Sequence, residues 1–230
     1  MTAAESFVDS VVTNGFATAP GCLSAGEIDA LIAELNESSL YRSRAGIRHL
    51  MQHPAVNKVA RSSPLLDMAC SVLGAAAFPF RATLFDKSPE SNWLVAWHQD
   101  TALPLRNRED RPGWGPWSVK EGILYAHAPA QALSEVLALR LHLDASTINN
   151  GPLRVLAATQ TQGILTDDGI EELAAKSPPV ECTTPRGGVL AMRPLLVHAS
   201  SKSRSQEPRR VLHIEYAAHP EMDGFLLAIA

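Results

Sequence analysis

Two stretches of alternating side chains constrain the fold of this chain more than any other feature. In 136–144, leucines alternate with polar residues that include Arg140 and His142. In 209–216, a mixed face that begins at Arg209 alternates with a mainly apolar face. Successive side chains of a β-strand point to opposite sides of the sheet. Each stretch therefore predicts a strand with one face toward an apolar core and the other toward a polar cavity.

The rest of the chain divides into a helical part and a β part. The first third, about 1–75, contains a capping box that opens at Ser24 ahead of apolar residues at helical spacing. A second helix is expected to start at Ser63, as its cap, with a proline in the first turn, and to end at Gly74. Short strand patterns separated by turns fill about 78–220. The sequence thus predicts a mainly β sandwich or barrel with flanking helices.

The length and composition favour one domain over 1–230. The chain has 230 residues, of which 46% are hydrophobic, enough for a substantial core. One segment, 103–133, fits neither pattern, and a loop of that length in a compact domain is usually functional. We expect it to form a lid or a substrate wall through Trp114 and Trp117, with ordinary packing as the alternative.

Charge and cysteine content exclude several classes of protein. The net charge is −4 and the basic residues are scattered, which argues against nucleic-acid binding. No run approaches the roughly 20 apolar residues of a membrane span, and the N-terminus has no signal-peptide core. Cys22, Cys70 and Cys182 lie far apart, as expected for free thiols in a reducing, cytoplasmic compartment. The oligomeric state stays open.

Three polar residues from two separate stretches of the chain suggest a metal site. His98 and Asp100 are two positions apart at the end of an apolar run, so both side chains point the same way while Gln99 points away. His198 follows another apolar run. Two imidazoles and one carboxylate are the ligands of non-haem Fe(II) oxygenases, which leave positions open for a cosubstrate and O₂. Zinc accepts the same ligands, and a surface His–Asp pair is the simpler alternative.

Arg209 is a candidate for binding an acidic cosubstrate. It lies on the mixed face of its strand, whereas Arg210 lies on the apolar face. A guanidinium holds a carboxylate through two parallel hydrogen bonds. The alternative is an exposed strand arginine. His142 and His213 share faces with Arg140 and Arg209, so they either line the cavity or have structural roles.

These motifs resemble those of the phytanoyl-CoA dioxygenase family of Fe(II)- and 2-oxoglutarate-dependent oxygenases, from about Gly15 to Tyr216. The most specific matching segments are 97–100, 150–153 and 198–200 with Arg209. The resemblance implies a double-stranded β-helix, which is a cupin-like jelly-roll barrel with flanking helices. It also implies a small-molecule substrate.

The resemblance further implies roles for single residues. The iron ligands would be His98, Asp100 and His198, and Arg209 with Ser200 would bind 2-oxoglutarate. Thr83 and Arg48 fall near family positions that contact this cosubstrate. Arg140 replaces an aromatic cosubstrate contact, so it could bind 2-oxoglutarate, bind an acidic substrate or be solvated. The expected substrate contacts are Trp114, Trp117 and Gln99.

The expected reaction is hydroxylation of an unactivated C–H bond in a small organic molecule, with 2-oxoglutarate and O₂ consumed and succinate and CO₂ released. The same iron site could instead give desaturation, cyclisation or epimerisation. A different class of protein, a barrel-fold binding protein without turnover, is the third alternative. The carboxylate of Asp100 disfavours halogenation, because halogenating relatives carry a small residue there.

Overall fold

The computed structural model describes residues 2–38 and 46–230, and a large antiparallel sheet runs through its centre. The strand order of this sheet is β1 (Phe16–Ala19), β11 (Val189–Met192), β8 (Val136–His142), β13 (Arg209–Ala217), β3 (Phe78–Lys87) and β2 (Gly46–Ile47). The two stretches with the clearest alternation, β8 and β13, are neighbours in the middle of it. Their polar faces therefore point to the same side of the sheet.

A second, smaller antiparallel sheet faces the first. Its order is β10 (Val180–Cys182), β9 (Leu153–Val155), β12 (His198–Ser200) and β4 (Val95–His98). Between the two sheets lies an apolar cluster to which both contribute, including Ala138, Leu190 and Val155. The two facing sheets form a jelly-roll barrel, and the prediction of a mainly β barrel with flanking helices is confirmed.

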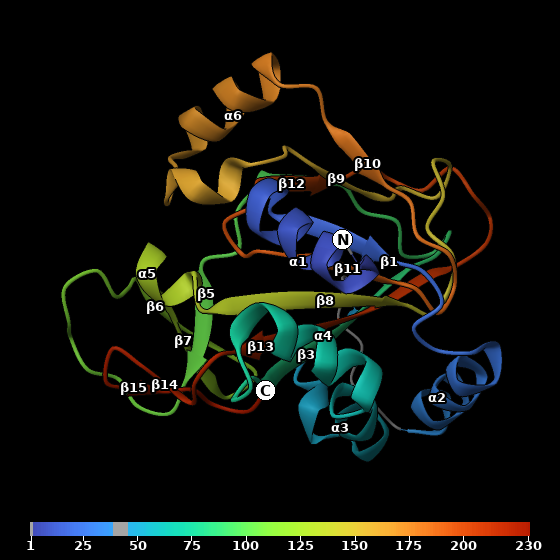
Figure 1. The fold of residues 1–230 in the computed structure, drawn as a ribbon, viewed down its shortest axis with the longest axis horizontal. Coiled ribbons are helices and arrows are strands. Elements are labelled where there is room, and N and C mark those ends of the chain that lie inside the picture. Colours follow the sequence, from blue (N-terminus) through green and yellow to red (C-terminus); the bar gives the residue numbers. More distant parts are fainter. Residues whose placement is uncertain (1, 39–45) are drawn as a thin grey trace.

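Helices cover the outside of the barrel (Figure 1). They are α1 (Ala3–Asn14), α2 (Ala25–Glu37), α3 (Pro54–Ala60), α4 (Ser63–Leu73), α5 (Ala130–Leu133) and α6 (Asp167–Lys176). The largest core cluster joins apolar residues of α2, α3 and α4 to the outer face of β8 and β13, as the alternation predicts. The hydroxyl of Tyr216 in β13 donates a hydrogen bond to the Ala60 carbonyl at the end of α3. Among the described residues, no helix is long and apolar enough to cross a bilayer.

The predicted helix starts are nearly right. The capping box at Ser24 is present, with Glu27 as its partner. The cap of α4 is Ser62 and not Ser63, which occupies the first turn and donates to the carboxylate of Asp67. Helices α1 and α6 were not predicted individually, although apolar residues recur at helical spacing in both, as at Phe7 and Val11 of α1 and at Ile170 and Leu173 of α6.

The prediction of a long loop over 103–133 is wrong. The segment contributes to a three-stranded sheet of order β5 (Ala102–Leu105), β7 (Ile123–His127) and β6 (Trp117–Lys120), followed by α5. A tight turn with positive φ angles at Glu121 and Gly122 joins β6 to β7. These strands are too short to show a clear alternation. They pack on a hairpin of β14 (Glu221–Met222) and β15 (Phe225–Leu226) near the C-terminus.

The helix-covered face of the large sheet should dominate stability. Leu139 is fully buried in the cluster beneath the helices, so Leu139→Ala leaves a cavity and should lower the free energy of unfolding by about 2–5 kcal/mol. Leu94 is 61% exposed, and Leu94→Ala should change it by less than about 0.5 kcal/mol. Equilibrium urea denaturation measures both. Equal losses in the two variants would contradict this placement of the core.

Candidate metal centre

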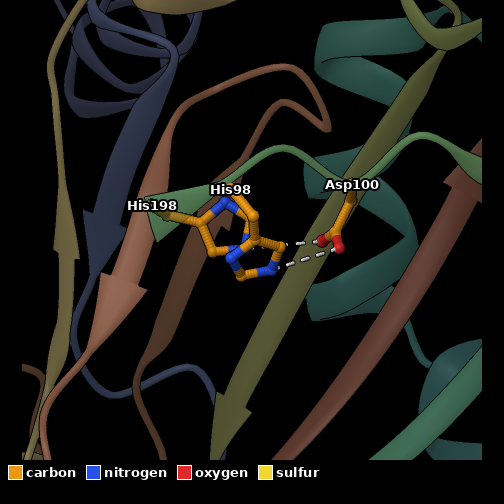
Figure 2. A group of neighbouring side chains, drawn as sticks. All are labelled: His98, Asp100 and His198. Atoms are coloured by element: carbon orange, nitrogen blue, oxygen red, sulfur yellow. Dashed lines mark ion pairs between the residues drawn. The ribbon is translucent and has the colours of Figure 1, made fainter. Parts of the chain in front are cut away.

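The small sheet brings His98 and His198 together. Strands β4 and β12 are antiparallel neighbours, and the two histidines are direct cross-strand partners. Asp100 lies two residues beyond His98, where its backbone N–H donates to the Pro194 carbonyl at 2.9 Å. Figure 2 shows both imidazoles turned toward the carboxylate, with Nε2–oxygen distances of 3.7 Å from His98 and 3.6 Å from His198. One atom from each of the three side chains lies within 4.8 Å of the others.

Backbone contacts set the orientation of both imidazoles. The Nδ1 atom of His98 lies 2.8 Å from the Ala96 carbonyl, and Nδ1 of His198 lies 2.8 Å from the Leu196 carbonyl. A carbonyl oxygen can only accept, so each Nδ1 carries the proton and each Nε2 keeps a free lone pair. Both lone pairs are on the side of Asp100. This arrangement, with the second ring nitrogen bound to the backbone, is typical of metal-ligating histidines.

The protonation states also suit a cation. Burial lowers the pKa of His198 to about 4 and outweighs the opposing effect of Asp100, so the ring is neutral at neutral pH. Desolvation acts to raise the pKa of Asp100, but the neighbouring His198, His98, His213 and Arg81 hold it well below its usual range. A divalent metal requires neutral imidazoles and an ionised carboxylate, and His198 and Asp100 meet this requirement before the metal binds. Mixed nitrogen and oxygen ligands without sulfur fit ferrous iron.

A cavity of about 110 Å³ opens beside these three residues, and several of the polar side chains that line it are buried. Arg209 lines it with 3% of its surface exposed, and its Nε has no hydrogen-bond partner among the described residues. Burial, and then the nearby Arg140, lower the pKa of Arg209 to about 10, so the guanidinium is still charged at neutral pH. A buried charge without a counterion is costly. An acidic ligand in this cavity would supply the missing negative charge.

Lys87 is a cavity residue that the sequence did not reveal. Lys87 is 1% exposed and lies opposite Arg209 in the register of β3 and β13. Its Nζ donates to the Ser200 hydroxyl at 2.9 Å and to the Ser201 carbonyl at 2.6 Å. The available signal was the two-residue period of β3, which places Lys87 on the same face as Phe85, another lining residue.

A glycine supports this lysine from outside the cavity. Gly151 has a φ of +68°, and a Cβ there would lie 2.3 Å from the Ser201 carbonyl oxygen that accepts from Lys87. Any side chain at this position would therefore displace the 201 backbone or strain its own. The glycine of segment 150–153 thus leaves room for the Ser201 carbonyl that accepts from Lys87.

Arg140 is not solvated, which removes one of its three alternatives. It is buried, lies over the Phe85 ring at 5.3 Å, and donates from Nη1 to His213 Nδ1 at 3.0 Å. His213 therefore accepts through Nδ1 and carries its proton on Nε2, which lies 3.7 Å from the Glu215 carboxylate. His142 is buried, and burial lowers its pKa to about 3, so this ring is neutral.

Gln99 does not point into the cavity and does not fit the expected substrate contact. Its Nε2 donates to the carbonyls of Leu195 at 2.7 Å and Gly163 at 2.9 Å, and its Oε1 accepts from the Leu165 N–H at 2.9 Å. All three bonds go to backbone of other segments. The side chain between the two ligands His98 and Asp100 is therefore a structural tie that fixes their strand end to the neighbouring loops.

The two tryptophans expected to wall the substrate lie elsewhere. The Trp114 indole N–H donates to Asp223 at 2.9 Å, and its ring centroid lies 4.6 Å from that of Phe225. Trp117 packs on the same phenylalanine at 5.7 Å. Neither lines the cavity beside the three ligands; Trp93 does. Local sequence could not distinguish these cases, because the partner Phe225 is distant in the chain.

A second cavity, of about 170 Å³, touches the opposite wall of the site. It shares Phe85, Asp100 and His213 with the first cavity. Its other lining residues are Arg48, Arg81, Thr83, Lys120 and Tyr125. Thr83 and Arg48, expected near the cosubstrate with Arg209 and Ser200, therefore line a different cavity from those two residues.

The comparisons with known proteins identify the family. The family model described as phytanoyl-CoA dioxygenase (PhyH) matches residues 11–211, most of the chain. This protein belongs to the phytanoyl-CoA dioxygenase family. It is a 2-oxoglutarate-dependent dioxygenase with Fe(II) and 2-oxoglutarate as cofactors, which decides between iron and zinc.

The chain is similar to one curated relative in sequence and to several solved structures in fold. The chain is 25% identical over 203 residues to L-proline trans-4-hydroxylase of Streptomyces griseoviridis, covering 74% of this chain and 68% of the relative. Its fold is similar to EctD from S. alaskensis, solved with 2-oxoglutarate and 5-hydroxyectoine, with a TM-score of 0.71, 17% identity, and 94% and 76% of the two chains covered. It is also similar to the epimerase SnoN of nogalamycin biosynthesis, with a TM-score of 0.67, 17% identity, and coverage of 93% and 82%.

The structural tie at Gln99 gives a prediction that separates it from a substrate contact. Gln99→Leu loses three partly buried hydrogen bonds to the backbone and should lower the free energy of unfolding by about 2–4 kcal/mol. Gln206 is exposed, and Gln206→Leu is the matched control, with an expected change below about 0.5 kcal/mol. Urea denaturation without metal or substrate measures both. A Gln99 variant as stable as the parent would return Gln99 to the list of substrate contacts.

Proposed function

We propose that the enzyme hydroxylates an unactivated C–H bond of a small organic molecule and releases succinate and CO₂ from 2-oxoglutarate. The proposal rests on one observation. The metal-ligand set of His98, Asp100 and His198 lies directly beside a cavity that is lined by buried cations. A hydroxylase, the L-proline trans-4-hydroxylase, is among the relatives, and EctD, which has a similar fold, was solved with 2-oxoglutarate and 5-hydroxyectoine.

The buried cations favour the first cavity as the binding site of the cosubstrate. The carboxylate of 2-oxoglutarate that is distant from the metal would be held by Arg209, Ser200 and Lys87, which lie around the same part of the cavity wall. Lys87 already donates to the Ser200 hydroxyl, so this hydroxyl is free to direct its own proton toward a carboxylate. No described carboxylate pairs with Arg209 or Lys87, which leaves both charges for the ligand.

The protein's own contribution is binding and positioning. His98, Asp100 and His198 would hold the iron through two nitrogen lone pairs and a carboxylate oxygen. Iron bound there supplies the oxygen chemistry that breaks a C–H bond. The far wall of the cavity, with His198, Ser200 and Arg209, is buried, whereas His98 and Asp100 are partly exposed, and the side chains provide no separate general acid or base.

A second outcome of the same iron site is epimerisation. The similarity to SnoN, an epimerase, is the observation that favours it. Desaturation and cyclisation use the same ligands and differ in how the substrate is posed. A binding protein without turnover is disfavoured because all three ligands and the Arg209 clamp are intact.

Removing the carboxylate ligand tests the proposal. Asp100→Ala should abolish Fe(II)-dependent succinate formation and the visible charge-transfer band that anaerobic Fe(II) and 2-oxoglutarate give with the parent, because one metal ligand is lost. Asp110 is exposed at 87%, and Asp110→Ala should retain both signals. Circular dichroism checks that each variant is folded. Turnover retained in Asp100→Ala would remove Asp100 from the site.

Lys87 should give the affinity for 2-oxoglutarate a characteristic pH dependence. Burial, then Arg209 and Arg140, lower the pKa of Lys87 to about 7, so its ammonium is charged below that pH and increasingly neutral above it. Binding of a dianion favours the charged form, so affinity should be highest below about pH 7 and weaken as the pH rises. Lys87→Met should bind at least about tenfold more weakly and lose this decline.

Titration of 2-oxoglutarate against the anaerobic Fe(II) enzyme at several pH values measures the effect. Lys58 lies exposed on α3, and Lys58→Met should keep the affinity and the pH profile of the parent. An unchanged profile in Lys87→Met would mean that Lys87 does not meet the cosubstrate.

A further inference from the structure

The second cavity lies next to the metal ligands but away from the cosubstrate clamp. The two cavities share one wall of Phe85, Asp100 and His213, while Arg209 lines the first and Lys120 the second. A molecule in the second cavity would thus lie beside Asp100 without competing for Arg209. Its volume of about 170 Å³ suits a small molecule or the head group of a larger one.

The charges around the second cavity do not balance. Arg81 is neutralised by an ion pair with the buried Glu215, and Arg48 is paired with Glu121 at 3.3 Å. Lys120 forms no ion pair with any described carboxylate, and its Nζ instead lies 4.9 Å from the Tyr125 ring centroid. Partial burial, and then Arg81 and Arg48, lower the pKa of Lys120, which reflects the positive surroundings. Lys120 is therefore a cation that lines the cavity without a fixed counterion.

The same imbalance remains after cofactor binding. A divalent iron offsets the carboxylate of Asp100 and the metal-side carboxylate of 2-oxoglutarate. The distal carboxylate would be neutralised by Arg209 and Lys87 in the first cavity. Arg140 and Lys120 then stay positive, and Arg140 acts on the shared wall through its hydrogen bond to His213. Arg140 lines only the first cavity, so the cation available to a ligand in the second cavity is Lys120, which is exposed. An acidic substrate could pair with Lys120 there, whereas a neutral one could not.

We propose that the substrate is a small molecule with a carboxylate, that this group binds to Lys120 in the second cavity, and that Tyr125 lines its site. This inference rests on the proposed function. Lys120 and Tyr125 belong to β6 and β7, so the segment 103–133 does provide a substrate wall, through these residues and not through its tryptophans. Arg48 is the second cation within this cavity and can move from Glu121 to a ligand, because both partners are exposed.

The test compares acids with amides of the same shape. The probes are benzoate with benzamide, hexanoate with hexanamide, and N-acetylglycine with its amide. Each is titrated calorimetrically into the anaerobic Fe(II) enzyme at saturating 2-oxoglutarate, and each is then tested for stimulation of succinate formation in air. At least one acid should bind about tenfold or more tightly than its amide, the effect of one charge-assisted hydrogen bond.

Two variants locate the binding group. Lys120→Gln should remove the preference for the acid and leave the affinity for the amide within about twofold. Lys176→Gln removes the same charge from the exposed face of α6 and should keep the preference. The proposal is overturned if no acid binds better than its amide, or if Lys120→Gln keeps the preference. Absence of the visible Fe(II)–2-oxoglutarate band in the folded parent would instead overturn the proposed function, so the two failures are distinguishable.

Discussion

The structure depends on one cross-strand pair, His98 opposite His198 in the small sheet. Antiparallel pairing of β4 with β12 brings two histidines from distant parts of the chain to adjacent positions. Each ring is then fixed by a 2.8 Å contact from Nδ1 to a carbonyl two residues earlier in its own strand. The side chain of Gln99 fixes the backbone just beyond His98, and this places Asp100 beside the two imidazoles. A slip of one residue in this register would turn one imidazole to the opposite face.

The second organising constraint is positive charge inside the barrel. Lys87, Arg140 and Arg209 are all buried around one small cavity, and burial lowers the pKa of each. Such a cluster does not stabilise the fold, because desolvated like charges repel and well-packed apolar residues would serve better. Its presence is explained by anionic ligands that arrive after folding. The cosubstrate accounts for the charges near Ser200, and Arg140 lies in the same cavity, where it donates to His213.

Much of this site was predictable from sequence, and the misses have one cause. The alternation in β8 and β13 correctly placed Arg140 and Arg209 on the interior face, and the spacing of His98 and Asp100 correctly placed both on one side. Lys87 was missed, and Gln99 and Trp114 were misassigned, because their partners are Ser201, Leu195 and Asp223, each distant in sequence. Local patterns give the direction of a side chain, whereas the identity of its neighbour depends on how the strands are paired.

The central claim is that His98, Asp100 and His198 bind one ferrous ion with 2-oxoglutarate beside Arg209. A crystal structure of the enzyme grown anaerobically with Fe(II) and 2-oxoglutarate measures this most directly. The account predicts iron bonded to Nε2 of both histidines and to the Asp100 carboxylate, with the free end of the cosubstrate on Arg209 and Lys87. Iron bound elsewhere, or the His198 ring turned away from the other two ligands, would contradict it.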